Sequence, residues 1–236
     1  MLKITNLTKS YGEKKAVDNL SLEIKPGEIC GFIGHNGAGK TTTIKNVCGI
    51  LGFDSGEIEV CGYDVLREPM QVKQNIAYIP DNPDIYEFLT GIKYLNFIAD
   101  CFGIDTADRA KQIAKYADSF ELTGALGNPV SSYSHGMKQK LALISAFMHN
   151  PKLLILDEPF VGLDPKAARI VKGLMRDLCL DGGAVFFSTH ILDTAEKLCD
   201  KVAVIQNGEL IAHGTVEEIK GNSSLEEMFF ELTTNE

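Results

Sequence analysis

The sequence has no long hydrophobic run, no excess of basic side chains and no closely paired cysteines, and each absence excludes a class of protein. A membrane-spanning helix needs about 20 consecutive apolar residues, and no run approaches that length. The 23 Lys and Arg residues are outnumbered by 32 Asp and Glu residues, giving a formal net charge of −9 at pH 7. Binding to nucleic acid or to an anionic lipid surface requires clustered Lys and Arg, so we expect neither. Any membrane association should therefore run through a protein partner.

The cysteines and histidines show none of the spacings that hold metals or disulfides. No C-x-x-C pair occurs among the 6 cysteines, and the 5 histidines are scattered without a zinc-binding pattern. Residues 2–5 do not begin a signal peptide. We therefore predict a cytosolic protein whose cysteines are reduced core residues. They are Cys30, Cys48, Cys61, Cys101, Cys179 and Cys199.

The length favours one core with a sizeable subdomain. A chain of 236 residues exceeds the commonest domain size but is short for two independent domains. Its composition, 44% hydrophobic and 23% charged, is that of an ordinary globular protein, and we find no repeats or low-complexity linker.

Short apolar segments bounded by turns predict β-strands in both halves of the chain. Residues 153–156 and 184–187 are continuous apolar runs, as expected for parallel strands covered on both faces. Asn207-Gly208 between two further segments is a strong hairpin signal. The predicted strands are residues 2–7, 16–24, 28–33, 57–60, 76–79, 153–156, 184–187, 202–205 and 209–212.

Between these halves the apolar pattern changes to helical periodicity. Residues 94–100 and 109–116 show it, and a further helix is predicted from Ser134 to Met148. Asp164 followed by Pro165 predicts another helix start. We expect one domain, 1–236, with an α/β core at about 1–82 and 151–215. A helical subdomain is inserted at about 83–150, and a helical tail, with a short helix at 225–232, occupies about 216–236.

Residues 34–41 fit the phosphate-binding pattern G-x-x-x-x-G-K-[ST] without a mismatch, between a strand candidate and a helix candidate. Glycines let backbone N–H groups turn inward around phosphate oxygens, and the helix beginning at Lys40 adds the positive end of its dipole. Lys40 can reach the β- and γ-phosphates, and the Thr41 hydroxyl can ligate magnesium. A Gly-rich turn without a ligand fits the full motif and its flanks less well. We predict a nucleoside triphosphate site made by Gly34, His35, Asn36, Gly37, Ala38, Gly39, Lys40, Thr41 and Thr42.

Two other strand candidates end in reactive residues. Residues 153–156 lead into Asp157 and Glu158, and residues 184–187 lead to His190. Ligands of open α/β sheets bind beyond the carboxyl ends of the strands, so we expect these side chains beside the phosphate loop. One acid can organise magnesium while the other orients or deprotonates the attacking water. Solvated acids at a strand end, and a core or helix-start histidine, are the alternatives.

Taken together, these residues resemble the nucleotide-binding subunit of an ATP-binding cassette (ABC) transporter over nearly the whole chain. Residues 34–41 match its Walker A motif, and residues 153–159 match Walker B with its adjoining glutamate. Residues 133–139 resemble the family signature LSGGQ, residues 162–165 the D-loop, and residues 188–190 the switch-histidine segment. Tyr11 occupies the position of the aromatic residue that stacks on adenine.

The resemblance implies a P-loop NTPase fold, with a RecA-like core, an antiparallel β subdomain and an inserted helical subdomain. Family members work as head-to-tail dimers with ATP between Walker A of one subunit and the signature of the other. On that basis Ser134 and the backbone N–H of Gly136 would bind the partner's γ-phosphate, and Asp164 would cross the interface as well as capping its helix.

Two departures from the family pattern bear on the site. The signature has Tyr133, His135 and Met137 where Leu, Gly and Gln are usual. A histidine there could restrict backbone approach or add a protonatable contact to phosphate. Asp81 stands where many members have a glutamine, and an ionised acid cannot donate a hydrogen bond, so its link to magnesium or water must differ. Such variation resembles the multidrug and antibiotic-peptide export branch, and so favours export over import.

The sequence thus predicts a cytosolic ATPase subunit that dimerises around two ATP molecules and drives separate transmembrane permease subunits from the cytoplasmic face of the cell membrane. The expected cofactors are ATP and Mg²⁺, and the dimer is either a homodimer or a heterodimer with another ABC ATPase. In this interpretation Lys40, Glu158 and His190 are catalytic, and Thr41, Asp157 and Asp81 hold the metal. A soluble ABC-type ATPase acting on ribosomes or DNA, and a small-molecule kinase or GTPase, are the alternatives.

Overall fold

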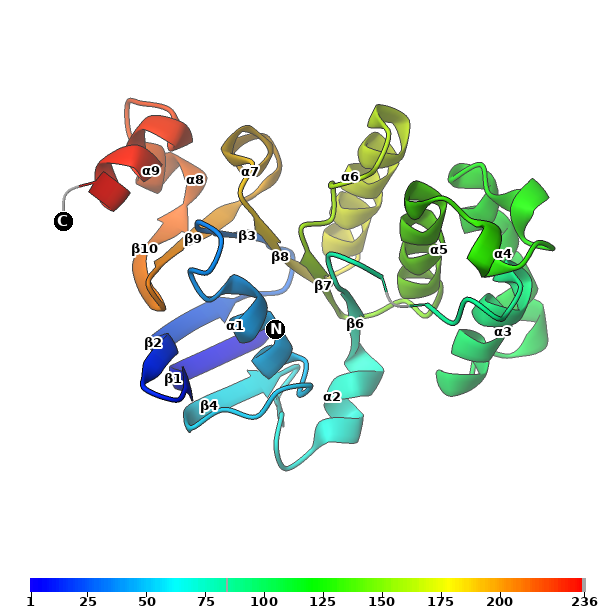
Figure 1. Ribbon diagram of the computed structural model, residues 1–236, viewed down its shortest axis with the longest axis horizontal. Helices are drawn as coiled ribbons and strands as arrows, with labels where there is room; N and C mark the ends of the chain where they lie inside the picture. Colours follow the sequence, from blue (N-terminus) through cyan, green and yellow to red (C-terminus); the bar gives the residue numbers. More distant parts are fainter. Residues whose placement is uncertain (84, 235–236) are drawn as a thin grey trace.

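Two β-sheets form the framework of the computed structural model, which describes residues 1–83 and 85–234 (Figure 1). Residues 84 and 235–236, part of the predicted helical subdomain and tail, lie outside the described residues. One sheet is antiparallel with strand order β2-β1-β4-β5, and the other has the order β10-β9-β3-β8-β7-β6. The strands are β1 (Leu2–Tyr11), β2 (Lys14–Ile24), β3 (Ile29–Ile33), β4 (Ser55–Val60), β5 (Tyr63–Asp64), β6 (Ile76–Ile79), β7 (Leu153–Asp157), β8 (Ala184–Thr189), β9 (Lys201–Gln206) and β10 (Glu209–Thr215).

The register of the larger sheet brings the three reactive strand ends to one edge. Strands β6, β7, β8, β3 and β9 run parallel, and only β10 pairs antiparallel, through the hairpin turn after β9. Ile33 at the end of β3 lies opposite Thr189 of β8, and Asp157 of β7 lies opposite Ser188. Every residue of β3, β7 and β8 is buried, so apolar packing fixes these strands and therefore the residues that follow them.

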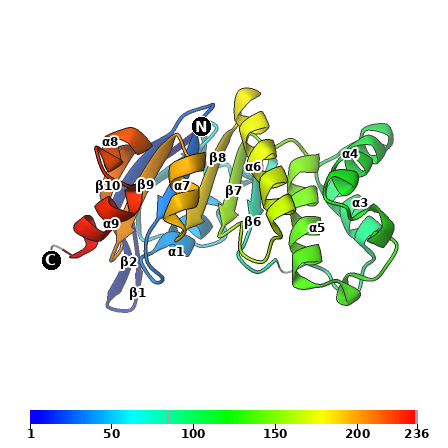
Figure 2. The ribbon, with the colours of Figure 1, turned by 90° about the horizontal axis from the view of Figure 1, so that it is seen from above.

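The helices cover the larger sheet and extend the molecule at both ends. Helices α3 and α4 lie at the end opposite to α8 and α9, and α5 packs on α3, α4 and β6 (Figures 1 and 2). The helices are α1 (Lys40–Val47), α2 (Pro69–Asn75), α3 (Gly91–Cys101), α4 (Thr106–Ser119), α5 (His135–Met148), α6 (Pro165–Leu180), α7 (Leu192–Leu198), α8 (Val216–Lys220) and α9 (Leu225–Thr234), with 3-10 turns at Thr123–Ala125 and Val130–Ser132.

Most of the predicted elements are present, and their caps explain where they begin. Ser134 caps α5 by accepting a hydrogen bond from the N–H of Met137, and Asp164 caps α6 through the N–H of Ala167. The strand at Ile76–Ile79 and the hairpin at Asn207-Gly208 are confirmed. Two short helices, α2 and α7, were not predicted, because segments of seven residues carry little periodicity. Helix α8 falls within the predicted helical tail at about 216–236.

The expectation that all six cysteines are core residues is wrong. Cys101 is exposed, and Cys61 and Cys199 are only partly buried. Cys101 is the last residue of α3, and the buried residues of that helix are Gly91, Tyr94, Leu95 and Ala99. Apolar neighbours in the sequence therefore did not predict its burial. All six thiols are free.

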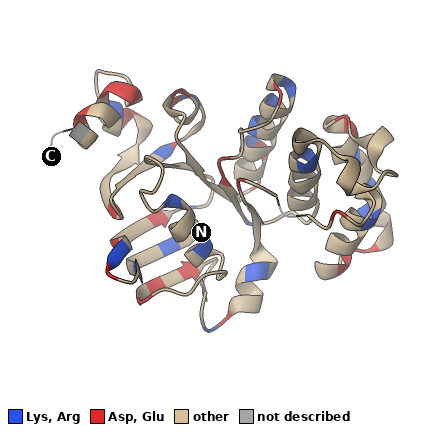
Figure 3. Ribbon diagram, viewed as in Figure 1, with Lys and Arg blue, Asp and Glu red and all other residues tan. Residues whose placement is uncertain are grey.

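Charged residues are distributed over many elements. Lys and Arg positions appear on both sheets and on several helices, together with Asp and Glu positions (Figure 3). Within residues 1–83 and 85–234, no helix has both the length and the apolar character needed to cross a membrane.

Candidate active site

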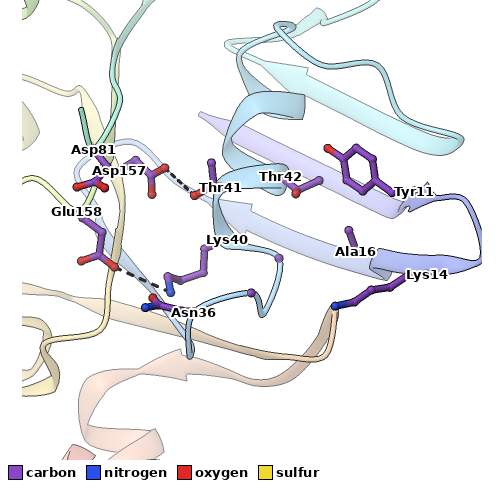
Figure 4. A pocket seen from close by; sticks show the side chains of 12 residues that line it. Tyr11, Lys14, Ala16, Asn36, Lys40, Thr41, Thr42, Asp81, Asp157 and Glu158 are labelled. Atoms are coloured by element: carbon purple, nitrogen blue, oxygen red, sulfur yellow. Dashed lines mark hydrogen bonds and ion pairs between the residues drawn. The ribbon is translucent and has the colours of Figure 1, made fainter. Parts of the chain in front are cut away.

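A cavity of about 310 Å³ opens where the two sheets meet. The phosphate loop forms its floor, and the ends of β1 and β7 form opposite walls (Figure 4). The cavity therefore gathers residues from distant parts of the sequence. Its lining residues are Tyr11, Lys14, Ala16, Asn36, Gly37, Gly39, Lys40, Thr41, Thr42, Asp81, Asp157 and Glu158.

Two glycines of the phosphate loop are required by the close approach of neighbouring backbone. Gly39 has φ +114°, and a Cβ atom there would lie 2.4 Å from the carbonyl oxygen of Ala16. A Cβ atom on Gly34 would lie 2.5 Å from the carbonyl oxygen of Ile205. The loop is therefore pressed between both sheets, and only glycine fits at these two points.

Lys40 is held inside the loop at the first position of α1. Its ammonium donates to the carbonyl oxygens of Gly34 (2.5 Å) and His35 (3.2 Å), and the side chain is 7% exposed. Burial lowers the pKa of Lys40, while the nearby carboxylates of Glu158 and Asp157 oppose that shift. The cation is thus fixed above the loop before any anion arrives.

A chain of hydrogen bonds joins the phosphate loop to the two acidic strand ends. The Thr41 hydroxyl donates to Oδ2 of Asp157 (2.8 Å), and the Ser188 hydroxyl donates to Oδ1 of the same carboxylate (2.5 Å). The Ser188 oxygen also accepts the backbone N–H of Glu158 (3.1 Å). Asp157 is nearly fully buried, and each of its two carboxylate oxygens accepts a hydrogen bond from one of these hydroxyls.

Glu158 lies between the buried lysine and the histidine that follows β8. Its Oε1 is 3.9 Å from the Lys40 ammonium, and its Oε2 is 3.0 Å from Nδ1 of His190. The backbone of Glu158 has φ +49°, a left-handed conformation that is uncommon for a residue other than glycine. Because of this backbone conformation, the two neighbouring carboxylates point in different directions. Asp157 contacts Thr41, and Glu158 approaches Lys40.

Tyr11 and Asp81 mark the far sides of the cavity (Figure 4). Tyr11 is 54% exposed, and the Lys9 ammonium lies 5.5 Å from the centroid of its ring. Asp81 follows β6 and faces the region of Asp157 and Glu158. Among the residues that the structure describes, there is no group of three or more His, Cys, Asp or Glu side chains arranged to hold a metal ion.

The signature-like segment lies apart from this cavity in the same chain. Neither Ser134 nor Gly136 lines it, and both stand at the start of α5. The His135 imidazole packs over Gly162, where a Cβ atom would lie 2.7 Å from Cδ2 of that ring. Lys140, five residues further along α5, forms an ion pair of 2.7 Å with Asp164. The side chain of His135 therefore contacts the loop before α6.

Three residues of the site were not singled out from the sequence. Lys14 and Ala16 line the cavity from β2, and Ser188 bridges the two acids from β8. Nothing in the local sequence marks Lys14 or Ala16 as a site residue rather than an ordinary strand residue. Ser188 could have been identified by its position at the end of a buried strand, directly before Thr189 and His190, where site residues gather.

The sequence model of the family described as "ABC transporter" matches residues 17–161. The chain belongs to the ABC transporter family. The curated "ABC-type transporter ATP-binding protein EcsA" of Bacillus subtilis is 35% identical over 238 residues, covering 99% of this chain and 96% of that protein. The "Linearmycin resistance ATP-binding protein LnrL" of Bacillus subtilis is 36% identical, covering 91% of this chain and 69% of that protein.

A solved structure agrees with this ABC family membership. The protein described as "Structure of ATP binding subunit of ABC transporter" superposes with a TM-score of 0.96 at 34% identity, covering 99% of this chain and 100% of that one. The chain is therefore an ATP-binding subunit of an ABC transporter, an ATPase built on the P-loop NTPase fold.

Proposed function

We propose that this ABC ATPase hydrolyses ATP with Glu158 as general base, Lys40 as phosphate clamp and His190 as a contact to the γ-phosphate. The observation that carries the proposal is the position of Glu158, with one oxygen 3.9 Å from the Lys40 ammonium and the other 3.0 Å from His190. A carboxylate held between a phosphate-binding cation and a histidine can accept a proton from water at the γ-phosphate.

The shape of the cavity supports one orientation for ATP. The exposed ring of Tyr11 offers a stacking surface for adenine at one side, and the acids stand at the other (Figure 4). The phosphates then lie across the loop at the start of α1, where backbone N–H groups and the helix dipole favour anions. The phosphate-binding residues in this proposal are Gly34, His35, Asn36, Gly37, Ala38, Gly39, Lys40, Thr41 and Thr42.

The same cavity fits Mg²⁺ bound together with the nucleotide. The Thr41 hydroxyl and the Asp157 carboxylate are hard oxygen donors 2.8 Å apart, and Asp81 adds a third oxygen group to the wall. Mg²⁺ is usually bound by one or two carboxylates, substrate phosphates and waters, so it needs no larger cluster of protein ligands. When bound, it would neutralise charge that develops on the phosphates.

We further propose that the site is completed by a second cassette in a head-to-tail dimer. Ser134 and Gly136 stand at the start of α5, a helix of 14 residues, outside the cavity of their own chain. The start of a helix, with its backbone N–H groups and the positive end of its dipole, suits the γ-phosphate of a partner's ATP. In that arrangement Asp164, the cap of α6, lies at the interface as well. The partner is another copy or another ABC ATPase.

The family supports a transport role. We propose that the chain powers separate transmembrane subunits, that it reaches the cytoplasmic face of the membrane only through them, and that residues 83–150 contact them. The word "resistance" in the name of LnrL favours export. A soluble ATPase acting on ribosomes or DNA is the alternative, and affinity capture of the chain from solubilised membranes separates the two. Recovery with ribosomes or DNA alone would contradict the transport role.

The catalytic proposal is tested by Glu158→Gln. The variant keeps the side-chain size but loses the base, so we expect turnover to fall at least 100-fold while an ATP-bound dimer accumulates. Size-exclusion chromatography with ATP and a phosphate-release assay measure the two effects, with the exposed Glu231→Ala as the matched control. Near wild-type turnover in Glu158→Gln would remove Glu158 from the role of base.

A further inference from the structure

Helix α9 packs against the outer side of the phosphate loop, although it lies outside the residues 17–161 that match the family. Leu225 at its start is fully buried in a cluster with Ile33 and Ala195, and Phe229 packs against the same cluster. Ile33 is the last residue of β3, directly before the loop. The backbone N–H of Leu225 donates to Glu196 of α7 (3.0 Å), which fixes where α9 begins.

The contact between α9 and the loop itself is made by two rings. The centroids of Phe229 and His35 are 5.0 Å apart, with the ring planes tilted by 60°. Tilted aromatic pairs at this separation are attractive beyond their buried area. His35 is otherwise exposed, so its contact with Phe229 limits where its ring can go.

His35 is also one of the supports of the phosphate-binding cation. Its carbonyl oxygen accepts a hydrogen bond from the Lys40 ammonium (3.2 Å) and another from the N–H of Ala38 (3.1 Å). A shift of His35 therefore moves an acceptor of Lys40 and changes the turn that holds the loop closed. The Phe229 ring is thus linked to Lys40 through a single residue.

The C-terminal end of α9 contacts Gln206, the last residue of β9. The Gln206 side chain donates to the carbonyl oxygen of Thr233 (3.4 Å). Gln206 and His35 both line a cavity of about 250 Å³ that shares Lys14, Asn36 and Gly37 with the nucleotide cavity. The helix therefore contacts the phosphate loop at His35 and ends beside a cavity that adjoins the nucleotide cavity.

We propose that Phe229 is a positioning residue for nucleotide binding, which holds His35 and thereby the acceptor of Lys40 in the geometry that receives phosphate. The inference rests on the proposed role of Lys40 as phosphate clamp. It assigns to the C-terminal helix a part in the affinity of this ATPase for its nucleotide.

The test is titration of the full chain with ATP and Mg²⁺, with Glu158→Gln as background in every variant to prevent turnover. We expect Phe229→Ala to weaken binding roughly three- to tenfold, the range of one aromatic pair. Phe229→Tyr should restore it, because the ring is kept, and the exposed Glu231→Ala should bind like its parent. In a His35→Ala background, Phe229→Ala should have no further effect. Without the Glu158→Gln background, KM should rise by the same factor with kcat changed less than twofold.

Two results would overturn the inference. One is unchanged binding in Phe229→Ala, and the other is an equal loss with and without the His35 ring, which would mean that α9 acts through general stability. Thermal unfolding of every variant is measured together with the titration. If Phe229→Ala folds poorly, Phe229→Leu takes its place in the titration, because leucine fills more of the space but lacks the ring. Lys40→Ala is measured in parallel. Unchanged binding in Lys40→Ala would contradict the proposed clamp, whatever Phe229→Ala does.

Discussion

Replacing Ser188 with alanine should be far more costly than its small size suggests. The hydroxyl donates to the buried carboxylate of Asp157 (2.5 Å) and accepts the backbone N–H of Glu158 (3.1 Å). Alanine removes both bonds and lets no water replace them, since Ser188 is fully buried. Asp157 keeps its second bond, from Thr41 (2.8 Å).

The magnitude follows from these contacts. A hydrogen bond to a charged group contributes about 1.5–3 kcal/mol, and an unsatisfied buried group costs about 1–3 kcal/mol. Because Thr41 still supports the carboxylate, we expect the free energy of unfolding to fall by about 2–4 kcal/mol. That is a large share of the roughly 5–15 kcal/mol that stabilises a typical domain. The ATPase rate should fall as well, because Glu158 loses the bond that fixes its backbone.

Urea unfolding monitored by circular dichroism measures the effect as a shift in midpoint at constant slope. The control is Ser119→Ala, which removes an exposed hydroxyl bonded to the carbonyl oxygen of Lys115 in its own helix (2.8 Å). That control should stay within about 0.5 kcal/mol. A Ser188→Ala loss no larger than the control would refute the view that this hydroxyl supports both acids.

Three further perturbations test other parts of the site and fold. Gly39→Ala places a Cβ atom 2.4 Å from the Ala16 carbonyl oxygen at φ +114°, so ATP binding in a calorimetric titration should fall more than tenfold, and wild-type affinity would contradict the close packing. Tyr11→Ala should raise KM for ATP by roughly tenfold, as expected for one lost base–aromatic stack, whereas Tyr11→Phe should not. Burial lowers the pKa of His149, so the unfolded state protonates first as pH falls below about 6.5, and stability should decrease there. That decrease should be smaller in His149→Phe, and an equal decrease would exclude His149 as its source.

The sequence predicted the strands that carry the chemistry because their signals are local. Residues 153–156 and 184–187 are unbroken apolar runs, and the phosphate loop is defined by spacing alone. The adjacency of Asp157, Glu158 and His190 then followed from the rule that parallel strands share one carboxyl edge.

What could not be predicted depends on contacts between distant segments. Ser188 looks like any polar residue after a strand until its register opposite Asp157 is known. The sequence did not decide what the His135 side chain contacts. The packing of α5 on the loop before α6 brings it against Gly162. Likewise, nothing near Phe229 in the sequence indicates that its ring meets His35.

The position of the nucleotide cavity between two sheets has a consequence for local stability. Tyr11 and Lys14 belong to the antiparallel sheet, whereas Lys40 follows β3 and Asp157 ends β7 of the other sheet. The hairpin turn at Gly208 joins the sheets by bonding to Asp18 and Ala38. The two sheets also share one buried apolar cluster, which includes Ile4 and Leu22 of the antiparallel sheet and Phe32 and Ile155 of the larger one. A ligand that spans the cavity adds a further connection, so separating the sheets must first release it. Bound ATP should therefore slow amide hydrogen exchange in β1 and β2 toward the rate of the buried parallel strands, because it strengthens the coupling between the two sheets.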